Sequence, residues 1–113
     1  MAIQHATDST FQGLLQIEGV AVVNFWAAWC GPCKMFAPVL EEFEREANDS
    51  IRVIKVNVDE NPITSDKFQI MSIPTTIIFK DGKLIYKEPG ILPKSVLAQL
   101  TASEWNGKWW VSL

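Results

Sequence analysis

Hydrophobic and polar residues along the chain follow two periods, and the pattern changes from one to the other several times. Runs of β-branched and aromatic residues predict strands at residues 3–5, 20–26, 51–58, 75–80 and 83–88. The first run is short and suits an edge strand. Residues 20–26 are apolar at nearly every position, which is typical of a central strand buried on both faces.

Helices are predicted between these strands from apolar residues spaced three or four positions apart. Thr7 and Asp8 are candidate N-caps of the first helix, and Asn61 with Pro62 begins a short third one. Asp81-Gly82 between the last two strands is a strong hairpin signal. The order of elements predicts an α/β fold with a central mixed five-stranded sheet flanked by about four helices.

The composition supports a single domain and argues against several classes of function. The 113 residues, 48% of them hydrophobic, suffice for one domain with one core. A net charge of −3 without a local basic run argues against nucleic-acid binding. The longest apolar stretch, residues 20–30, falls far short of the roughly 20 residues that span a bilayer, so no membrane segment is expected. The start of the chain lacks the features of a signal peptide, and we expect a cytoplasmic protein.

The chemically informative residues lie between the strand at 20–26 and the second predicted helix. There Cys30 and Cys33 are separated by Gly31 and Pro32. Cysteines three residues apart on a first helical turn bring their sulfur atoms close enough to form a disulfide. Unpaired N–H groups at a helix N-terminus favour a Cys30 thiolate, and we expect Cys33 to lie deeper and to be less exposed. Two cysteines without an export signal indicate chemistry rather than a structural crosslink.

Several segments of the chain resemble thioredoxins. Residues 29–34, Trp-Cys-Gly-Pro-Cys-Lys, reproduce the active-site signature of that family, and Phe-Trp-Ala at residues 25–27 precedes it as in the family. Further along the chain, three more segments are similar to thioredoxin segments at the expected separations, namely residues 55–59, 73–75 and 79–82. Several motifs in the right order are far more specific than a lone pair of cysteines.

The resemblance covers about residues 3–102 and implies the thioredoxin fold and the activity of a protein-disulfide reductase. Cys30 would attack a substrate disulfide, and Cys33 would resolve the resulting mixed disulfide. The resemblance also implies a cis peptide bond between Ile73 and Pro74, beside a shallow apolar groove for the substrate. The residues implied to line this groove are Trp29, Gly31, Pro32, Ile73, Pro74 and Gly90.

The partners follow from the same resemblance. We expect a monomeric, general intracellular reductase that acts on disulfide-containing client proteins and holds no bound cofactor and no metal. Its redox-active group would be the Cys30–Cys33 disulfide, reduced in trans by thioredoxin reductase with NADPH.

One residue departs from the family pattern. Thioredoxins usually bury an aspartate two positions before the Trp of Phe-Trp-Ala, and that position is Asn24 here. The family's carboxylate helps the second cysteine to lose its proton, whereas an amide cannot accept a proton near neutral pH. Asn24 is thus expected to favour the Cys30 thiolate and to slow resolution by Cys33. Lys55, the usual neighbour of that aspartate, would lose its counter-charge and help to hold Cys33 as a thiolate. A satisfied buried amide without catalytic consequence is the alternative for Asn24.

Other readings of the cysteine pair remain open at this point. Two cysteines three residues apart are half of a zinc site, although the chain has a single histidine, His5, and no second such pair. A thiol oxidase or isomerase would use the same residues at a more oxidising potential. A non-catalytic partner subunit or holdase would use the groove and the end of the chain instead.

The end of the chain is unusual. We assign residues 1–104 to the thioredoxin domain and residues 105–113 to a Trp-rich C-terminal extension of it, which holds Trp105, Trp109 and Trp110. Unpacked aromatic residues of this kind would form a sticky patch. The extension is therefore expected either to fold back onto the domain or to serve as a surface for a partner or for self-association.

Overall fold

The computed structural model describes residues 2–102. The expectations for the extension at residues 105–113, and for the domain boundary before it, lie outside these residues. The five strands are β1 (Gln4–Ala6), β2 (Val20–Trp26), β3 (Ile51–Asn57), β4 (Thr75–Lys80) and β5 (Lys83–Pro89). The four helices are α1 (Phe11–Leu14), α2 (Gly31–Glu46), α3 (Pro62–Lys67) and α4 (Lys94–Leu100).

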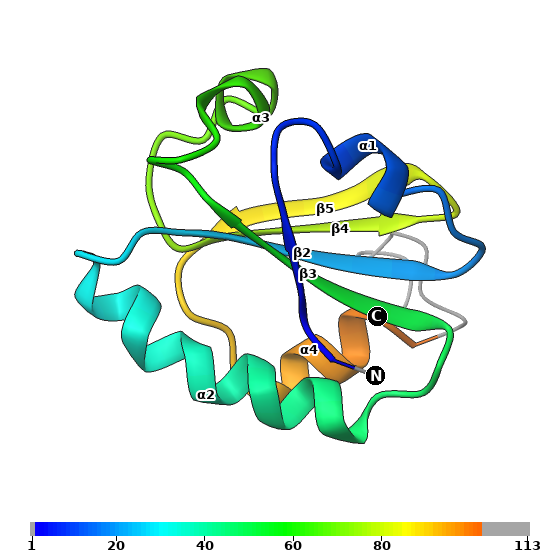
Figure 1. Cartoon of the computed structure of the whole chain (residues 1–113). Coiled ribbons are helices and arrows are strands. Elements are labelled where there is room, and N and C mark those ends of the chain that lie inside the picture. Colours follow the sequence, from blue (N-terminus) through cyan, green and yellow to red (C-terminus); the bar gives the residue numbers. More distant parts are fainter. Residues whose placement is uncertain (1, 103–113) are drawn as a thin grey trace.

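The strands form one mixed sheet in the order β1-β3-β2-β4-β5. β2 runs parallel to β3 and antiparallel to β4, and it pairs with both along most of its length. Helices cover both faces: α1 and α3 lie on one side of the sheet, and α2 and α4 lie on the other (Figure 1). The predicted architecture, a mixed five-stranded sheet flanked by four helices, is confirmed.

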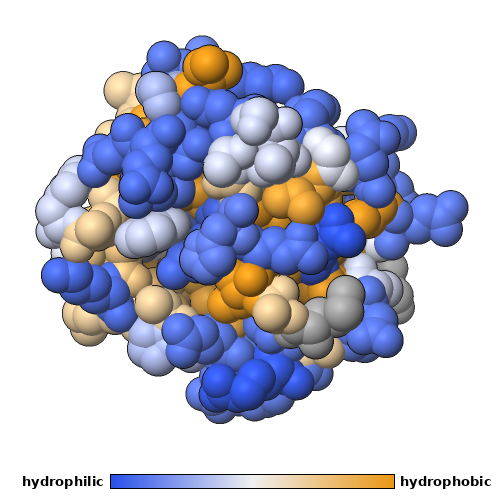
Figure 2. Space-filling view, in the orientation of Figure 1, coloured by the Kyte–Doolittle hydropathy of each residue, from blue (hydrophilic) through white to orange (hydrophobic). Residues whose placement is uncertain are grey.

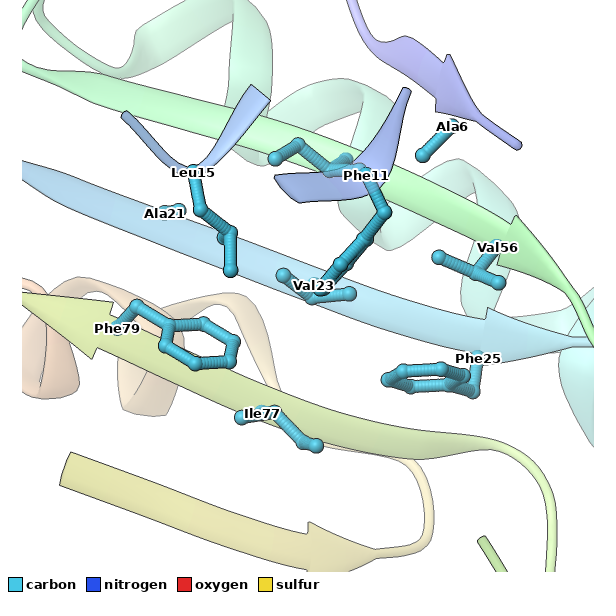
Figure 3. Close-up of a cluster of buried hydrophobic side chains, with 10 residues drawn as sticks. Ala6, Phe11, Leu15, Ala21, Val23, Phe25, Val56, Ile77 and Phe79 are labelled. Carbon is cyan, nitrogen blue, oxygen red and sulfur yellow. The ribbon is translucent and has the colours of Figure 1, made fainter. Parts of the chain in front are cut away.

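The core has two layers that share β2. Successive side chains of a strand point to opposite faces, so Val22 packs with Phe36 and Leu40 of α2, whereas Val23 packs with Phe11 on the other face. Figure 3 shows Phe11 and Leu15 reaching from the region of α1 toward Val23 of the sheet. Burial on both faces explains why the sequence of β2 is almost continuously apolar.

Asp8 is the clearest difference from the predicted elements. α1 is a single turn whose N-cap is Thr10, not Thr7 or Asp8. The Asp8 carboxylate instead accepts hydrogen bonds from the Ile63 and Thr64 backbone N–H groups and from Thr64 Oγ1, at 3.3, 2.8 and 2.6 Å. Burial acts to raise the pKa of Asp8, but the hydrogen bonds from Thr64 and Ile63 outweigh it and lower that pKa below its usual range. Asp8 therefore caps α3, a helix more than fifty residues away in sequence.

The sheet ends at the β4–β5 hairpin. Asp81 and Gly82 have positive φ angles of 50° and 83°, as a two-residue hairpin turn requires, and the predicted turn is confirmed. β5 is the outer strand, and most of its side chains are exposed, including Lys83 and Lys87. In Figure 2, hydrophilic side chains cover most of the visible face, with smaller hydrophobic areas between them. Among the described residues, no helix combines the length and apolar character needed to cross a membrane.

Candidate active site

The two cysteines lie where the central strand passes into the longest helix. β2 ends at Trp26, and Cys30 is the N-cap of α2, with an extended backbone conformation (φ −89°, ψ 113°). Cys30 and Cys33 form a disulfide, with their Cα atoms 5.3 Å apart. The Cys33 backbone N–H is one of the first donors of the helix, which have no acceptor within it. It donates to Cys30 Sγ, with the nitrogen 3.2 Å from the sulfur. A thiolate on Cys30 would be stabilised by the same N–H and by the N-terminus of the helix.

Both cysteines are buried. The relative exposure is 5% for Cys30 and 6% for Cys33, so the prediction that Cys33 would be the less exposed residue is wrong. The reason is the small apolar cluster around the disulfide, in which Ala27 is fully buried and Val58 and Ile73 pack against the pair. Oxidation and reduction therefore take place at the edge of an apolar surface rather than on a projecting side chain.

Ile73 and Pro74 approach the disulfide from the loop before β4. The peptide bond between them is cis, as the resemblance implied. The Ile73 carbonyl oxygen lies 3.7 Å from Cys30 Sγ. A disulfide sulfur carries no hydrogen, so this is a contact in the oxidised state and a possible hydrogen bond only for a Cys30 thiol. The Gly90 N–H donates to the Pro74 carbonyl at 2.8 Å, which brings three of the predicted groove residues together.

Trp29 precedes Cys30 in the chain and is 69% exposed. Its indole Nε1–H donates to Asp59 Oδ2 at 2.8 Å. Gly31 and Pro32, next in the chain, are also exposed. Sequence reasoning missed Asp59. The available signal was its place just after β3, because the ends of two neighbouring parallel strands meet at one edge of the sheet (Figure 1).

Asn24 and Lys55 are opposite each other in the β2–β3 register, two positions before the ends of these strands. Asn24 is 2% exposed, and its Nδ2 has no hydrogen-bond partner among the described residues. The same is true of Oγ1 of Thr76, which sequence reasoning missed and which faces Asn24 from β4. A buried donor without a partner among the described residues costs free energy, and the catalytic consequence of Asn24 stays a prediction.

Lys55 is half-buried and lies over the Trp26 ring, with Nζ 4.7 Å from the ring centroid. Burial lowers the pKa of Lys55 below its usual range, and the charge of Glu41 offsets part of this effect. Lys55 therefore keeps a carboxylate neighbour from α2 even though position 24 holds an amide.

Comparison with known proteins identifies the family. The sequence model of the family described as Thioredoxin matches residues 2–103. The chain belongs to the thioredoxin family. Thioredoxins of Staphylococcus saprophyticus and Staphylococcus haemolyticus are each 52% identical to it, and the thioredoxin of Bacillus subtilis is 48% identical, all over 100 residues. Each match covers 88% of this chain and 95% of the related thioredoxin.

As a member of the thioredoxin family with a Cys30–Cys33 disulfide, the chain is a thiol–disulfide oxidoreductase, a protein-disulfide reductase of the thioredoxin type. Within residues 2–102, no three His, Cys, Asp or Glu side chains are grouped closely enough to hold a metal ion.

The hydrogen bond between Trp29 and Asp59 can be tested by removing its acceptor. In Asp59→Ala we expect the Trp29 indole N–H signal to move and its exchange with solvent to accelerate about threefold to tenfold, as for the loss of one hydrogen bond. Asp59→Asn keeps an oxygen acceptor and should retain the slower exchange. Both are measured from indole signals in ¹H–¹⁵N spectra, with Trp26 as the internal control. An unchanged Trp29 signal in Asp59→Ala contradicts the assignment.

Proposed function

We propose that the chain is a general intracellular protein-disulfide reductase in which Cys30 attacks the substrate and Cys33 resolves the mixed disulfide. The observation that carries this assignment is the place of Cys30 at the N-cap of α2. The Cys33 N–H and the helix N-terminus there favour a negative charge on Cys30 Sγ. Cys33 lies within the first turn of the helix, three residues after Cys30.

The reaction proceeds in two exchanges. The Cys30 thiolate forms a bond to one sulfur of the substrate disulfide and displaces the other sulfur as a thiolate. The Cys33 thiolate then attacks Cys30 Sγ, which breaks the mixed disulfide and releases the second substrate thiolate. The two electrons that reduce the substrate come from the dithiol, which ends as the Cys30–Cys33 disulfide.

The substrate segment is proposed to lie across the exposed surface beside Cys30. Trp29, Gly31 and Pro32 form one side of this surface, and the loop holding Ile73 and Pro74 forms the other, with Gly90 bound to Pro74. An extended client segment can pair with the backbone of Ile73 in the manner of strand addition. Recognition of this kind depends on backbone and apolar contacts and thus suits many clients.

The oxidised protein must be returned to the dithiol. We propose thioredoxin reductase with NADPH as the donor, acting in trans, with disulfide-containing proteins of the cytoplasm as clients. The surface beside Cys30 would bind thioredoxin reductase and the client proteins in turn, since both must reach Cys30 Sγ.

The roles of the two cysteines are separated by single substitutions. Cys33→Ser removes the resolving group, so Cys30 should form a stable mixed disulfide with thionitrobenzoate; mass spectrometry detects the adduct. Cys30→Ser removes the attacking group and leaves Cys33, whose sulfur does not occupy the N-cap of α2, so adduct formation should be reduced at least about tenfold. Equal rates in the two variants would contradict the assignment of Cys30 as the attacking residue.

The reduction potential decides between a reductase and an oxidase or isomerase. We expect a value near about −270 mV, characteristic of thioredoxins, when the protein is equilibrated with dithiothreitol or glutathione buffers. Fluorescence of Trp29, the neighbour of Cys30, reports the redox state. A value of about −120 to −180 mV, as in oxidases and isomerases, would contradict the reductase assignment.

Asn24 is proposed to make resolution the weakened step, because no carboxylate at this position takes the proton of Cys33. In Asn24→Asp, Cys33 should displace thionitrobenzoate from Cys30 about tenfold faster or more, since positioned bases contribute at least this much. Asn48→Asp makes the same isosteric change at an exposed site and should leave the rate unchanged. Equal lifetimes of the mixed disulfide in Asn24→Asp and in the parent would contradict the proposal that Asn24 slows resolution.

A further inference from the structure

A second concave surface lies at the opposite end of the sheet from the cysteines. It is a groove of about 490 Å³ between the C-terminal end of α2, the start of β2 and β3, and α4. Val20 lines it at the beginning of β2, whereas Cys30 follows the end of that strand. The seven residues of β2 span about 20 Å, so this groove is separate from the redox site.

Small side chains create the hollow. Ala47 ends α2, and Ala98 and Ala102 face the same space from α4 and the residues after it. The floor is apolar, formed by Phe43 and Ile51. Larger side chains at the alanine positions would fill the groove, and its volume lies in the range of sites that enclose drug-sized ligands.

The walls of the groove are held in place by charge pairs at its rim. Lys94 at the start of α4 binds the carboxylates of Glu42 and Glu46 on α2, at 2.7 and 2.8 Å. These contacts raise the pKa of Lys94 and lower that of Glu42, mainly through the hydrogen bond between them. The apolar floor is thus preformed between two helices that are tied together.

The chain itself supplies an apolar segment at this groove. Thr101 and Ala102, the last described residues, line it, and the sequence continues for eleven residues that include three of the five tryptophans. Figure 1 shows the described chain leaving α4 toward the end of the sheet where β2 begins and α2 ends. Trp105 is three residues beyond Ala102 and can extend only about 10 Å from it, which is enough to reach the groove but not the cysteines.

We propose that residues 103–113 dock in this groove of the same molecule, with a tryptophan side chain on Phe43, Ala47 and Ala98. A planar indole fits an apolar floor with small side chains around it, and its N–H can remain at the polar rim. The side chains of the segment include one acidic and one basic residue, whose charges cancel, and the rim of the groove is likewise of mixed charge. The groove is then an intramolecular docking site that closes the domain on the side remote from Cys30.

The proposal is tested with methyl-labelled alanine in the full chain and in a chain ended after Ser103. In NMR spectra of the full chain we expect nuclear Overhauser cross-peaks from indole protons to the methyl groups of Ala47 and Ala98. The chemical shifts of these two methyl groups should differ between the full and the truncated chain. The methyl group of Ala27, beside the disulfide, is the internal control. Absence of the cross-peaks in the full chain would overturn the proposal.

Matched variants locate the contact. Ala98→Glu places a charge in the groove and should abolish the cross-peaks to Ala47, whereas Gln99→Glu adds the same charge on the next residue of α4, outside the groove lining, and should keep them. Cross-peaks that persist in Ala98→Glu would overturn this groove as the site. Cross-peaks found between differently labelled copies in a mixture would assign the groove to a second copy instead and overturn intramolecular docking.

The reductase activity provides an independent readout. The truncated chain should reduce a disulfide client at the parent rate within about twofold, because the groove is separate from the cysteines. A larger loss of activity on truncation would contradict the separation of the two sites. The cross-peaks do not depend on catalysis, so failure of the docking proposal and failure of the proposed function are distinguishable.

Discussion

The placement of the site depends on the two-sided pairing of β2. This strand is hydrogen-bonded to β3 and β4 and buried on both faces, so a shift of its register by one residue would turn its whole apolar set to the wrong face. Trp26 at its end leads directly to Cys30. Across the sheet, Phe25 pairs with Thr75, the residue after Pro74. One strand therefore fixes both the disulfide and the loop that faces it.

Much of this arrangement could be predicted from local sequence, because strand periodicity, the Asp81-Gly82 turn and the cysteine spacing each operate over a few residues. Contacts between distant segments could not. Asp8 resembles an N-cap of the helix that follows it, yet its carboxylate caps α3, 55 residues further along the chain. Asp59 binds Trp29 from a loop thirty residues away. Such pairs become evident only when the order and direction of the strands are known.

Beneath the cysteines, the chain keeps polar side chains where apolar ones would pack better. Asn24 and Thr76 face each other across β2 and β4, each with a polar atom that has no partner within residues 2–102, and the half-buried Lys55 lies opposite Asn24 on β3. Leaving such groups unpaired opposes folding. The apolar layers on both faces of β2 outweigh this cost. The apolar layers around β2 thus support the residues that we propose to influence proton movement at the disulfide.

The exposed outer strand also determines how copies of the chain meet. An unpaired β-edge is a template for another strand, and repeated addition leads to fibrillar aggregates. Here an incoming strand would encounter Lys83, Lys87 and Glu88 and would lack a donor at Pro89. Lys87 is also held against the carbonyl oxygens at the end of α3, with Nζ 2.7 Å from the Phe68 oxygen. The outer edge of the sheet is in this way protected from pairing with the same edge of a second copy.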